Sequence, residues 1–205
     1  MLLALFCGIF VNLIKKSLTT RFGGNTEMDY NCERKCDAAA PKQLGTLRSL
    51  TSVYLTCGEQ ILLLYRQGSR VVNNKWISSA GGHFEDGEFR DARLCALREV
   101  KEELGLDGDA LQNLSLRYVS LRRTPEEIRQ NYYFFAELPD GPSMELTSNE
   151  GVLRWFRLDE IESLDMPFTS KYVTSHWLHT GRFTDALYGG VATGEDMVFT
   201  ELAEF

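Results

Sequence analysis

The sequence has no excess of basic charge, few prolines and no apolar run long enough to cross a bilayer. Its 205 residues carry 22 Lys and Arg against 29 Asp and Glu, which gives a formal net charge of −7. Binding to a nucleic-acid polymer usually requires a basic face, so we expect no such partner. With only five prolines and 17 glycines, the chain is not collagen-like, and its 43% hydrophobic content is that of an ordinary globular protein.

Cysteine is also scarce, with five residues in the whole chain. A chain of this length forms a core without disulfide crosslinks, and an odd number of cysteines favours free thiols. We therefore expect a cytoplasmic protein in a reducing compartment.

Residues 1–14 are almost wholly apolar. They are too few for a membrane-spanning helix, which needs about 20 residues, and no basic leader or small-residue cleavage site marks a secretory signal. Three interpretations remain: an interfacial anchor, an apolar appendage packed on the domain, or a translation start at Met28. We favour the later start and expect no membrane attachment. The chain then divides into an apolar stretch with a linker at 1–47 and a domain at 48–205.

Apolar periodicity in the rest of the chain predicts an α+β domain. The strand-like runs 50–57 and 60–65 are joined by Gly58-Glu59 as a hairpin. Helical periodicity is clearest over 92–104 and weaker over 172–179. Further strands are predicted over 114–121, 131–138, 152–156, 186–192 and 197–202. Strands and helices interleave without regular βαβ spacing, so we expect an α/β/α sandwich with a mixed central sheet.

The segment 81–106, with the sequence GGHFEDGEFRDARLCALREVKEELGL, joins a glycine pair to a helix rich in carboxylates. One face of this helix carries an apolar stripe made of Ala96, Val100 and Leu104. Glu99, Glu102 and Glu103 project from adjoining positions on another side. Neighbouring carboxylates repel one another, so a bound hard cation such as Mg²⁺ or Mn²⁺ explains the pattern. Taken alone, a solvated helix face explains it as well.

The same segment resembles the signature of the Nudix hydrolases, a loop–helix box that hydrolyses phosphate compounds. The box runs Gly, five residues, Glu, seven residues, Arg-Glu, a bulky aliphatic, one residue, Glu-Glu, one residue, Gly, a bulky aliphatic. The chain supplies Gly82, Glu88, Arg98-Glu99-Val100, Glu102-Glu103, Gly105 and Leu106. It departs from the box at one point, because nine residues rather than seven separate Glu88 from Arg98. Either Glu88 or Asp91, a candidate helix N-cap, is then left to brace the loop.

The resemblance implies a role for each matching residue. Glu99, Glu102 and Glu103 match the metal-holding carboxylates, and Gly82 matches the glycine whose carbonyl is a further ligand. Arg98 matches the arginine that orients the carboxylates, and Glu150 lies where many relatives place a distal carboxylate. The implied reaction is metal-assisted hydrolysis of a diphosphate bond, with Mg²⁺ or Mn²⁺ as the cofactor. One of these four glutamates would accept the proton of the attacking water.

Beyond the box, residues 66–76 and 155–168 look like members of the family that clean the nucleotide pool. Such members convert an oxidised purine triphosphate such as 8-oxo-dGTP to the monophosphate and pyrophosphate. The candidate substrate contacts are Arg66, Asn74, Trp76, Phe168 and Lys171. Thr169-Ser170 stand where the animal enzyme has adjacent aspartates that read the base.

The sequence leaves alternatives open for the substrate and for catalysis itself. The chain could act on another nucleoside diphosphate derivative, such as ADP-ribose or a nucleotide sugar, or bind a nucleotide as a non-catalytic sensor. A Nudix-fold isomerase is disfavoured, because its cysteine motifs are missing. In each hydrolytic case the expected partner is a small-molecule nucleotide, and the protein is a monomer or a homodimer.

Overall fold

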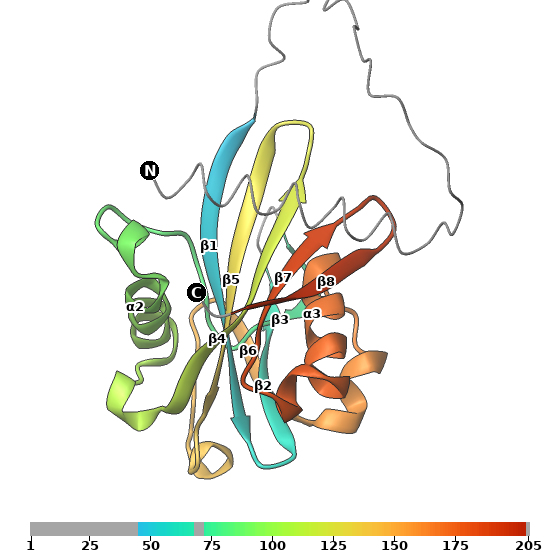
Figure 1. Cartoon of the computed structure of the whole chain (residues 1–205). Coiled ribbons are helices and arrows are strands. Elements are labelled where there is room, and N and C mark those ends of the chain that lie inside the picture. The colour runs from blue at the N-terminus through green and yellow to red at the C-terminus, as the bar shows by residue number, and fades with distance from the viewer. Residues whose placement is uncertain (1–44, 68–71, 204–205) are drawn as a thin grey trace, which may run out of the picture. The chain divides into compact units, whose positions relative to one another are not determined.

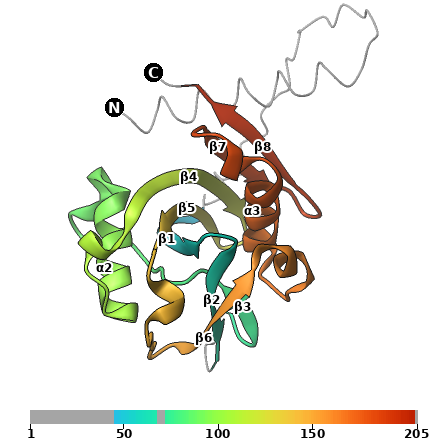
Figure 2. The same ribbon diagram turned by 90° about the horizontal axis from the view of Figure 1, so that it is seen from below.

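The computed structural model describes residues 45–67 and 72–203, which belong to a unit spanning Gln43–Phe205. Within this part, helices α2 (Ala92–Leu104) and α3 (Phe168–His179) lie on opposite sides of a mixed sheet, as Figures 1 and 2 show. The expected α+β sandwich is therefore confirmed. The apolar stretch at 1–14 and Met28 lie outside the described residues.

The sheet contains strands from nearly the whole length of the described chain. They are β1 (Thr46–Cys57), β2 (Gln60–Arg66), β3 (Lys75–Ile77), β4 (Gln112–Arg123), β5 (Glu127–Glu137), β6 (Gly151–Arg157), β7 (Leu187–Ala192) and β8 (Met197–Leu202). The predicted strands are all present, although several are longer than the apolar pattern indicated. Strand β3 is too short to show a period and was not predicted. Strand β1 begins at Thr46, two residues before the predicted start of the domain.

Strand β2 changes its pairing partner partway along one of its edges. The strand order is β3-β2-β1-β5-β4-β7-β8, and β6 pairs with β2 along its whole length. On its other edge β2 pairs with β1 only at Gln60–Leu62, and with β3 from Leu64 to Arg66. Strand β1 continues in a parallel pairing with β5. The earlier part of β1 therefore leaves an edge free for another segment, and this edge positions the site.

Two apolar clusters fill the spaces between the sheet and the helices. Because side chains alternate along a strand, Val53 and Leu55 join the cluster around α2, whereas Tyr54 joins the cluster around α3. The stripe predicted on α2 is buried as expected. On the opposite side the Trp177 ring of α3 stacks on Phe135, with ring centroids 4.5 Å apart. Each large buried side chain contributes about 1.5–3 kcal/mol to folding.

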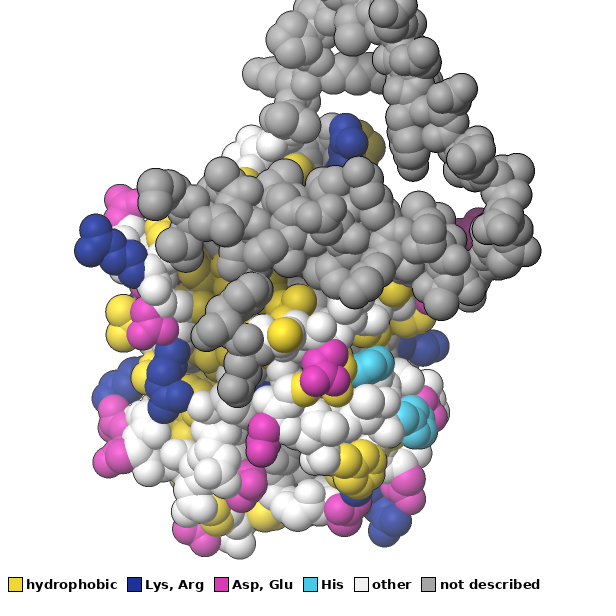
Figure 3. Space-filling model, in the orientation of Figure 1, with side chains coloured by type: hydrophobic (Ala, Val, Ile, Leu, Met, Phe, Trp, Pro, Cys, Tyr) yellow, Lys and Arg dark blue, Asp and Glu magenta, His cyan; other side chains and the backbone are white. Residues whose placement is uncertain are grey.

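The described surface is mixed in charge. On the face seen in Figure 3, Lys and Arg side chains are interspersed with Asp and Glu. None of the helices in residues 45–67 and 72–203 is long and apolar enough to cross a membrane.

Candidate active site

A glycine-containing segment occupies the edge of β1 that β2 leaves free. Val53 donates its N–H to the Ala80 carbonyl at 2.8 Å, and Thr51 donates to the Gly82 carbonyl at 2.8 Å. Side chains are excluded where the segment passes closest to its neighbours. A Cβ on Gly81 would overlap the Thr51 carbonyl, and a Cβ on Gly82 would overlap the carboxylate of Glu99. The two glycines therefore allow the backbone to lie between β1 and the helix that carries the carboxylates.

The orientation of the two glycines differs. The Gly82 carbonyl turns toward β1, where it accepts the hydrogen bond from Thr51. In an extended segment, neighbouring residues direct their backbone groups to opposite sides. Gly81 accordingly turns toward α2, and its N–H donates to Glu103 Oε2 at 3.0 Å. Gly81 therefore meets the carboxylates through its N–H, and the Gly82 carbonyl, which the box resemblance implies as a ligand, accepts a hydrogen bond from β1.

Helix α2 begins and ends with favourable caps. The Asp91 side chain accepts a hydrogen bond from the Arg93 N–H at 2.9 Å, and Gly105 ends the helix in the left-handed conformation, with φ of 68°. An N-cap of this kind contributes about 1 kcal/mol, and a left-handed C-cap favours glycine. Asp91 therefore acts as the helix cap and fixes the register in which the following glutamates face the loop.

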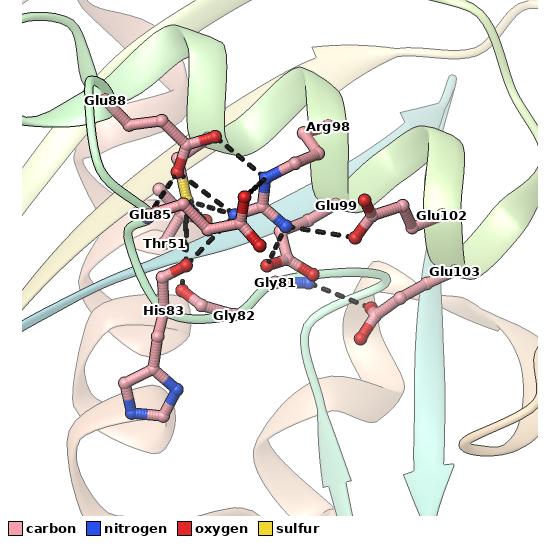
Figure 4. A network of polar contacts seen from close by, with 11 residues as sticks. Thr51, Gly81, Gly82, His83, Glu85, Glu88, Arg98, Glu99, Glu102 and Glu103 are labelled. Atoms are coloured by element: carbon pink, nitrogen blue, oxygen red, sulfur yellow. Dashed lines mark hydrogen bonds and ion pairs between the residues drawn. The ribbon is translucent and has the colours of Figure 1, made fainter.

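Arg98 is the centre of the polar network in Figure 4. Its Nη1 atom lies 2.8 Å from Glu99 Oε1 and 3.0 Å from Glu102 Oε2. Its Nη2 atom donates to the His83 carbonyl at 3.0 Å, which ties the helix to the glycine segment. A planar guanidinium with fixed donors suits this bracing. The orienting role implied for Arg98 agrees with this geometry.

Glu88 reaches Arg98 despite the two additional residues in the loop. Its carboxylate accepts from Arg98 Nε at 2.8 Å and from Nη2 at 3.0 Å, and it also accepts from the Glu85 N–H. The hydrogen bond from Arg98 lowers the pKa of Glu88 to about 2. The extra residues are accommodated in a 3₁₀ turn at Glu88–Arg90. Of the two bracing candidates, Glu88 holds the loop and Asp91 caps the helix.

The carboxylates on the cavity side have fewer cationic partners. Burial raises the pKa of Glu99, and burial together with the nearby charge of Glu150 raises the pKa of Glu103 to about 8. Glu150 lies on the loop before β6, with its Oε2 atom 2.8 Å from Arg66 Nη1. Glu102 is more exposed than these three, at 57% of its side chain. Glu99, Glu102 and Glu103 form a carboxylate wall along this side of α2. Together with Glu150 they carry more negative charge than the neighbouring cations neutralise.

A cavity of about 810 Å³ opens beside this wall. It is lined by Glu99, Glu103 and Glu150, by Gly81 and Gly82, and by residues of β1, β3, β4, β5 and the start of α3. In the described residues, no three Asp, Glu, His or Cys side chains form a ready-made metal cage. Burial and the positive charge of Arg48 lower the pKa of His83, which lines the same cavity.

The predicted substrate contacts divide into two groups. Arg66 and Phe168 line the cavity, whereas Asn74, Trp76 and Lys171 do not. Trp76 packs between Tyr65 and Phe156, with ring centroids at 4.9 and 4.6 Å, so it belongs to the core. Asn74 forms a turn, with φ of 56°, and Lys171 is exposed on α3.

Several cavity residues were not singled out from the sequence. They are Arg48 and Ser52 on β1, Ser120 on β4, Arg129 and Asn131 on β5, and Lys75 on β3. All of them lie on strands. The signal available in the sequence was polar side chains at every second position of a strand, which indicates that one face of the strand is not packed in the core. Which strands lie side by side depends on long-range pairing, and the sequence pattern does not indicate it.

Comparisons with known proteins agree with the geometry. A model of the NUDIX domain matches residues 46–177, more than half of the chain. Curated protein sequences gave no match. Among solved structures, the chain is similar to a mutator MutT protein from Bacillus halodurans, with 22% identity over 75% of this chain and 97% of that one and a TM-score of 0.55. A MutT protein from Methanosarcina mazei Go1 has 16% identity over 68% and 98%, and a TM-score of 0.55.

A further similar structure is an Ap4A hydrolase from C. elegans, with 15% identity, coverage of 68% of this chain and 99% of that one, and a TM-score of 0.52. The chain belongs to the Nudix family. It is a hydrolase that acts on pyrophosphate bonds in nucleotide-like small molecules.

Proposed function

We propose that the protein uses Mg²⁺ to hydrolyse a purine nucleoside triphosphate, 8-oxo-dGTP or a related oxidised purine nucleotide, to the monophosphate and pyrophosphate. The main support is the wall formed by Glu99, Glu102 and Glu103 beside the glycine segment. Glu99 and Glu103 line a cavity of nucleotide size, and Arg98 fixes the direction of Glu99 and of the neighbouring Glu102. Mn²⁺ has the same preference for oxygen ligands and would serve in its place.

The donor set fits a hard divalent cation. Burial, together with the charge of neighbouring carboxylates such as Glu150, raises the pKa values of Glu99 and Glu103, and a bound cation would relieve that repulsion. We assign Glu99, Glu102 and Glu103 as the side-chain ligands. The Gly82 carbonyl is the backbone ligand in this proposal, since its second lone pair remains after the hydrogen bond from Thr51. Bound Mg²⁺ would supply charge neutralisation for the phosphates and lower the pKa of a bound water.

The protein's own groups prepare the proton transfer. Glu103 and Glu150 adjoin each other at the cavity wall, and Arg66 holds Glu150 by an ion pair. Once the charge between them is neutralised, either carboxylate has an oxygen free to accept the proton of the attacking water. Arg98 holds Glu99 and Glu102 in place beside this pair. We assign the proton acceptor to the Glu103–Glu150 pair.

The other end of the cavity suits a purine base. Phe168 offers an aromatic face, and base–aromatic stacking is worth about 1–3 kcal/mol. Asn131, Ser120 and Thr169 line the same region. Amide and hydroxyl groups both donate and accept hydrogen bonds, so they can pair with a base that presents an N–H donor beside a carbonyl acceptor.

The test is a kinetic screen with Mg²⁺ of 8-oxo-dGTP, dGTP, ADP-ribose, a nucleotide sugar and a dinucleoside polyphosphate. We expect 8-oxo-dGTP to lead in kcat/KM by at least about tenfold, which is about 1.4 kcal/mol in the barrier. If ADP-ribose leads, the substrate assignment is wrong. Binding of every compound without turnover would indicate a sensor.

A matched pair of variants tests the catalytic assignment. Glu103→Gln removes a carboxyl group that can bind the metal or accept a proton, and it should lower kcat by about 100-fold or more. Glu145→Gln makes the same change at an exposed loop position away from the cavity and should leave kcat unchanged. Equal activity of the two variants, with circular dichroism showing both folded, would refute the role of Glu103.

A further inference from the structure

Three arginines form a row across neighbouring strands. In the strand register Arg48 of β1 lies opposite Arg129 of β5, and Arg129 lies opposite Arg122 of β4. Paired residues of adjacent strands point to the same face of a sheet, and the strands lie about 4.8 Å apart. All three arginines line the cavity of the active site.

The charge of this row is only partly neutralised. Glu127 contacts both Arg48 and Arg129, with its Oε2 atom 3.2 Å from Arg48 Nε, and the hydrogen bond from Arg129 lowers the pKa of Glu127. Arg122 lies over the Phe168 ring, with its guanidinium carbon 5.5 Å from the ring centroid. Among the described residues, no carboxylate forms an ion pair with Arg122.

The three cations thus have one carboxylate partner among them, which pairs with Arg48 and Arg129, although the protein as a whole carries a net charge of −7. Like charges on directly paired strand positions destabilise a sheet. An anionic ligand would relieve the repulsion, and guanidinium groups match the oxygens of a phosphate well. The arrangement is therefore unfavourable without a ligand and favourable with one.

The row is well separated from the carboxylate wall. Gly81 packs against Thr51 and Ser52 of β1, and Arg48 lies four positions before Ser52. At about 3.3 Å per residue, the two points are roughly 13 Å apart along the strand. A phosphate at the row would therefore belong to a different part of the ligand from the diphosphate held at the carboxylates.

We propose that Arg48, Arg129 and Arg122 form a second phosphate subsite, which selects purine nucleotides that carry a phosphate on the sugar in addition to the hydrolysed polyphosphate. The proposal rests on the proposed function in taking the cavity as the nucleotide site. It adds a substrate class: nucleotides phosphorylated at two separate positions. Phe168, which contacts Arg122, connects the base region to this subsite.

The experiment compares nucleotides that differ only in the sugar phosphate. Guanosine 3′,5′-bisdiphosphate is paired with GDP, and coenzyme A with dephospho-coenzyme A, using the full chain with Mg²⁺. We expect kcat/KM to favour the phosphorylated member of a pair by tenfold or more. Arg122→Gln and Arg129→Gln should each reduce that ratio at least threefold. The dissociation constants of guanosine 3′,5′-bisdiphosphate and GDP, measured by calorimetry, should show the same preference.

Arg123→Gln is the matched control, because Arg123 neighbours Arg122 but lies on the opposite face of β4, away from the cavity. This variant should keep the wild-type ratio. Turnover without any phosphate preference would overturn the subsite and leave the proposed hydrolysis standing. A binding preference that Arg122→Gln removes, found in a protein without turnover, would support the subsite and contradict the hydrolysis. A preference unaffected by both Arg122→Gln and Arg129→Gln would overturn the subsite.

Discussion

The backbone N–H of Gly81 donates a hydrogen bond to Glu103 Oε2 at 3.0 Å. This bond links the glycine segment to the last carboxylate of the box, on the side of α2 that Arg98 does not reach. The two ends of the carboxylate wall are therefore held by different means, a guanidinium at Glu99 and Glu102 and a backbone amide at Glu103. Glu103, which has no guanidinium partner among the described residues, is also the carboxyl group with the strongly raised pKa.

Metal binding should become tighter as the pH rises. The pKa of Glu103 in the metal-free protein is raised to about 8, mainly by burial and then by Glu150, so Glu103 holds a proton at neutral pH. Mg²⁺ must displace this proton. We expect the Mg²⁺ affinity to increase between about pH 6 and pH 8, with proton release detectable by calorimetry in buffers of different ionisation enthalpy. Glu150→Gln should shift the increase to lower pH, and a pH-independent affinity would contradict this explanation.

In the metal-free protein, the contribution of Glu103 to folding stability should decrease as the pH rises. A carboxyl whose pKa is raised on folding stabilises the folded state below its unfolded pKa, and this contribution is lost as the pH rises through the folded pKa. For Glu103 the loss falls between about pH 4.5 and pH 8. In EDTA, the Tm of wild type relative to Glu103→Gln should therefore decline across this range. Saturating Mg²⁺ should abolish the decline, and an identical decline with and without Mg²⁺ would argue against metal binding at Glu103.

The Glu88–Arg98 pair should have the opposite dependence. Its folded pKa of about 2 lies below the ordinary value of 4.5, so the ionised carboxylate stabilises the folded protein above pH 4.5. Glu88→Gln should lower the free energy of unfolding at pH 7 by about 2–3 kcal/mol. The difference should shrink as the pH falls from 4.5 toward 2. Urea denaturation at several pH values measures it.

Glu85→Gln is the control for this prediction, since the Glu85 carboxylate is 68% exposed and lies 3.9 Å from Arg98 Nε. An exposed pair of this kind contributes less than about 1 kcal/mol. If the two substitutions lower the free energy of unfolding equally, the two hydrogen bonds between Glu88 and Arg98 do not stabilise the fold more than an exposed ion pair does.

Gly82→Ala should impair activity more than stability. A Cβ at this position would overlap the Glu99 carboxylate, which must rotate away from its place in the wall. We expect kcat/KM to fall by about 100-fold, because small misplacement of a positioning group has effects of this size. Gly194→Ala, at a position where an added Cβ meets nothing within 4 Å, is the control. A Gly82→Ala enzyme with wild-type kcat/KM would be inconsistent with the close packing of loop and helix.

Two aromatic residues should respond differently to truncation. Phe168→Ala removes a cavity face and should raise KM by about tenfold, as expected for loss of base stacking. Trp76→Ala removes a ring packed against Tyr65 and Phe156 and should cost about 3 kcal/mol of stability. Its KM should change little. Steady-state kinetics and denaturation of both variants measure the contrast, and the reverse pattern would place Trp76 at the substrate.

The sequence predicted those features that depend on local chemistry. Helix α2 was predicted with its observed bounds, because Asp91 and Gly105 mark its ends and the apolar stripe between them is regular. The proximity of Glu99, Glu102 and Glu103 also follows from helical spacing alone. The arginine row could not be predicted, because it depends on the register of three strands far apart in the chain.

The sequence also could not predict the direction in which individual carbonyl groups and side chains point. The sequence does not indicate that the Gly82 carbonyl pairs with β1, nor that Trp76 packs against Tyr65 while Lys75 and Ile77 line the cavity. These orientations follow from the exchange of β1 for β3 beside β2, a long-range feature. Short polar or aromatic motifs in such a region identify the neighbourhood of a site but not its lining.

The 3₁₀ turn at Glu88–Arg90 has a consequence for recognising relatives of this protein. It accommodates two inserted residues while Glu88, the first residue of the turn, still meets Arg98 on the helix. A search pattern with a fixed number of positions between these two partners would pass over every chain with the longer loop. A pattern that allows this gap to vary, and keeps the spacing from Arg98 to Leu106 fixed, would detect such chains.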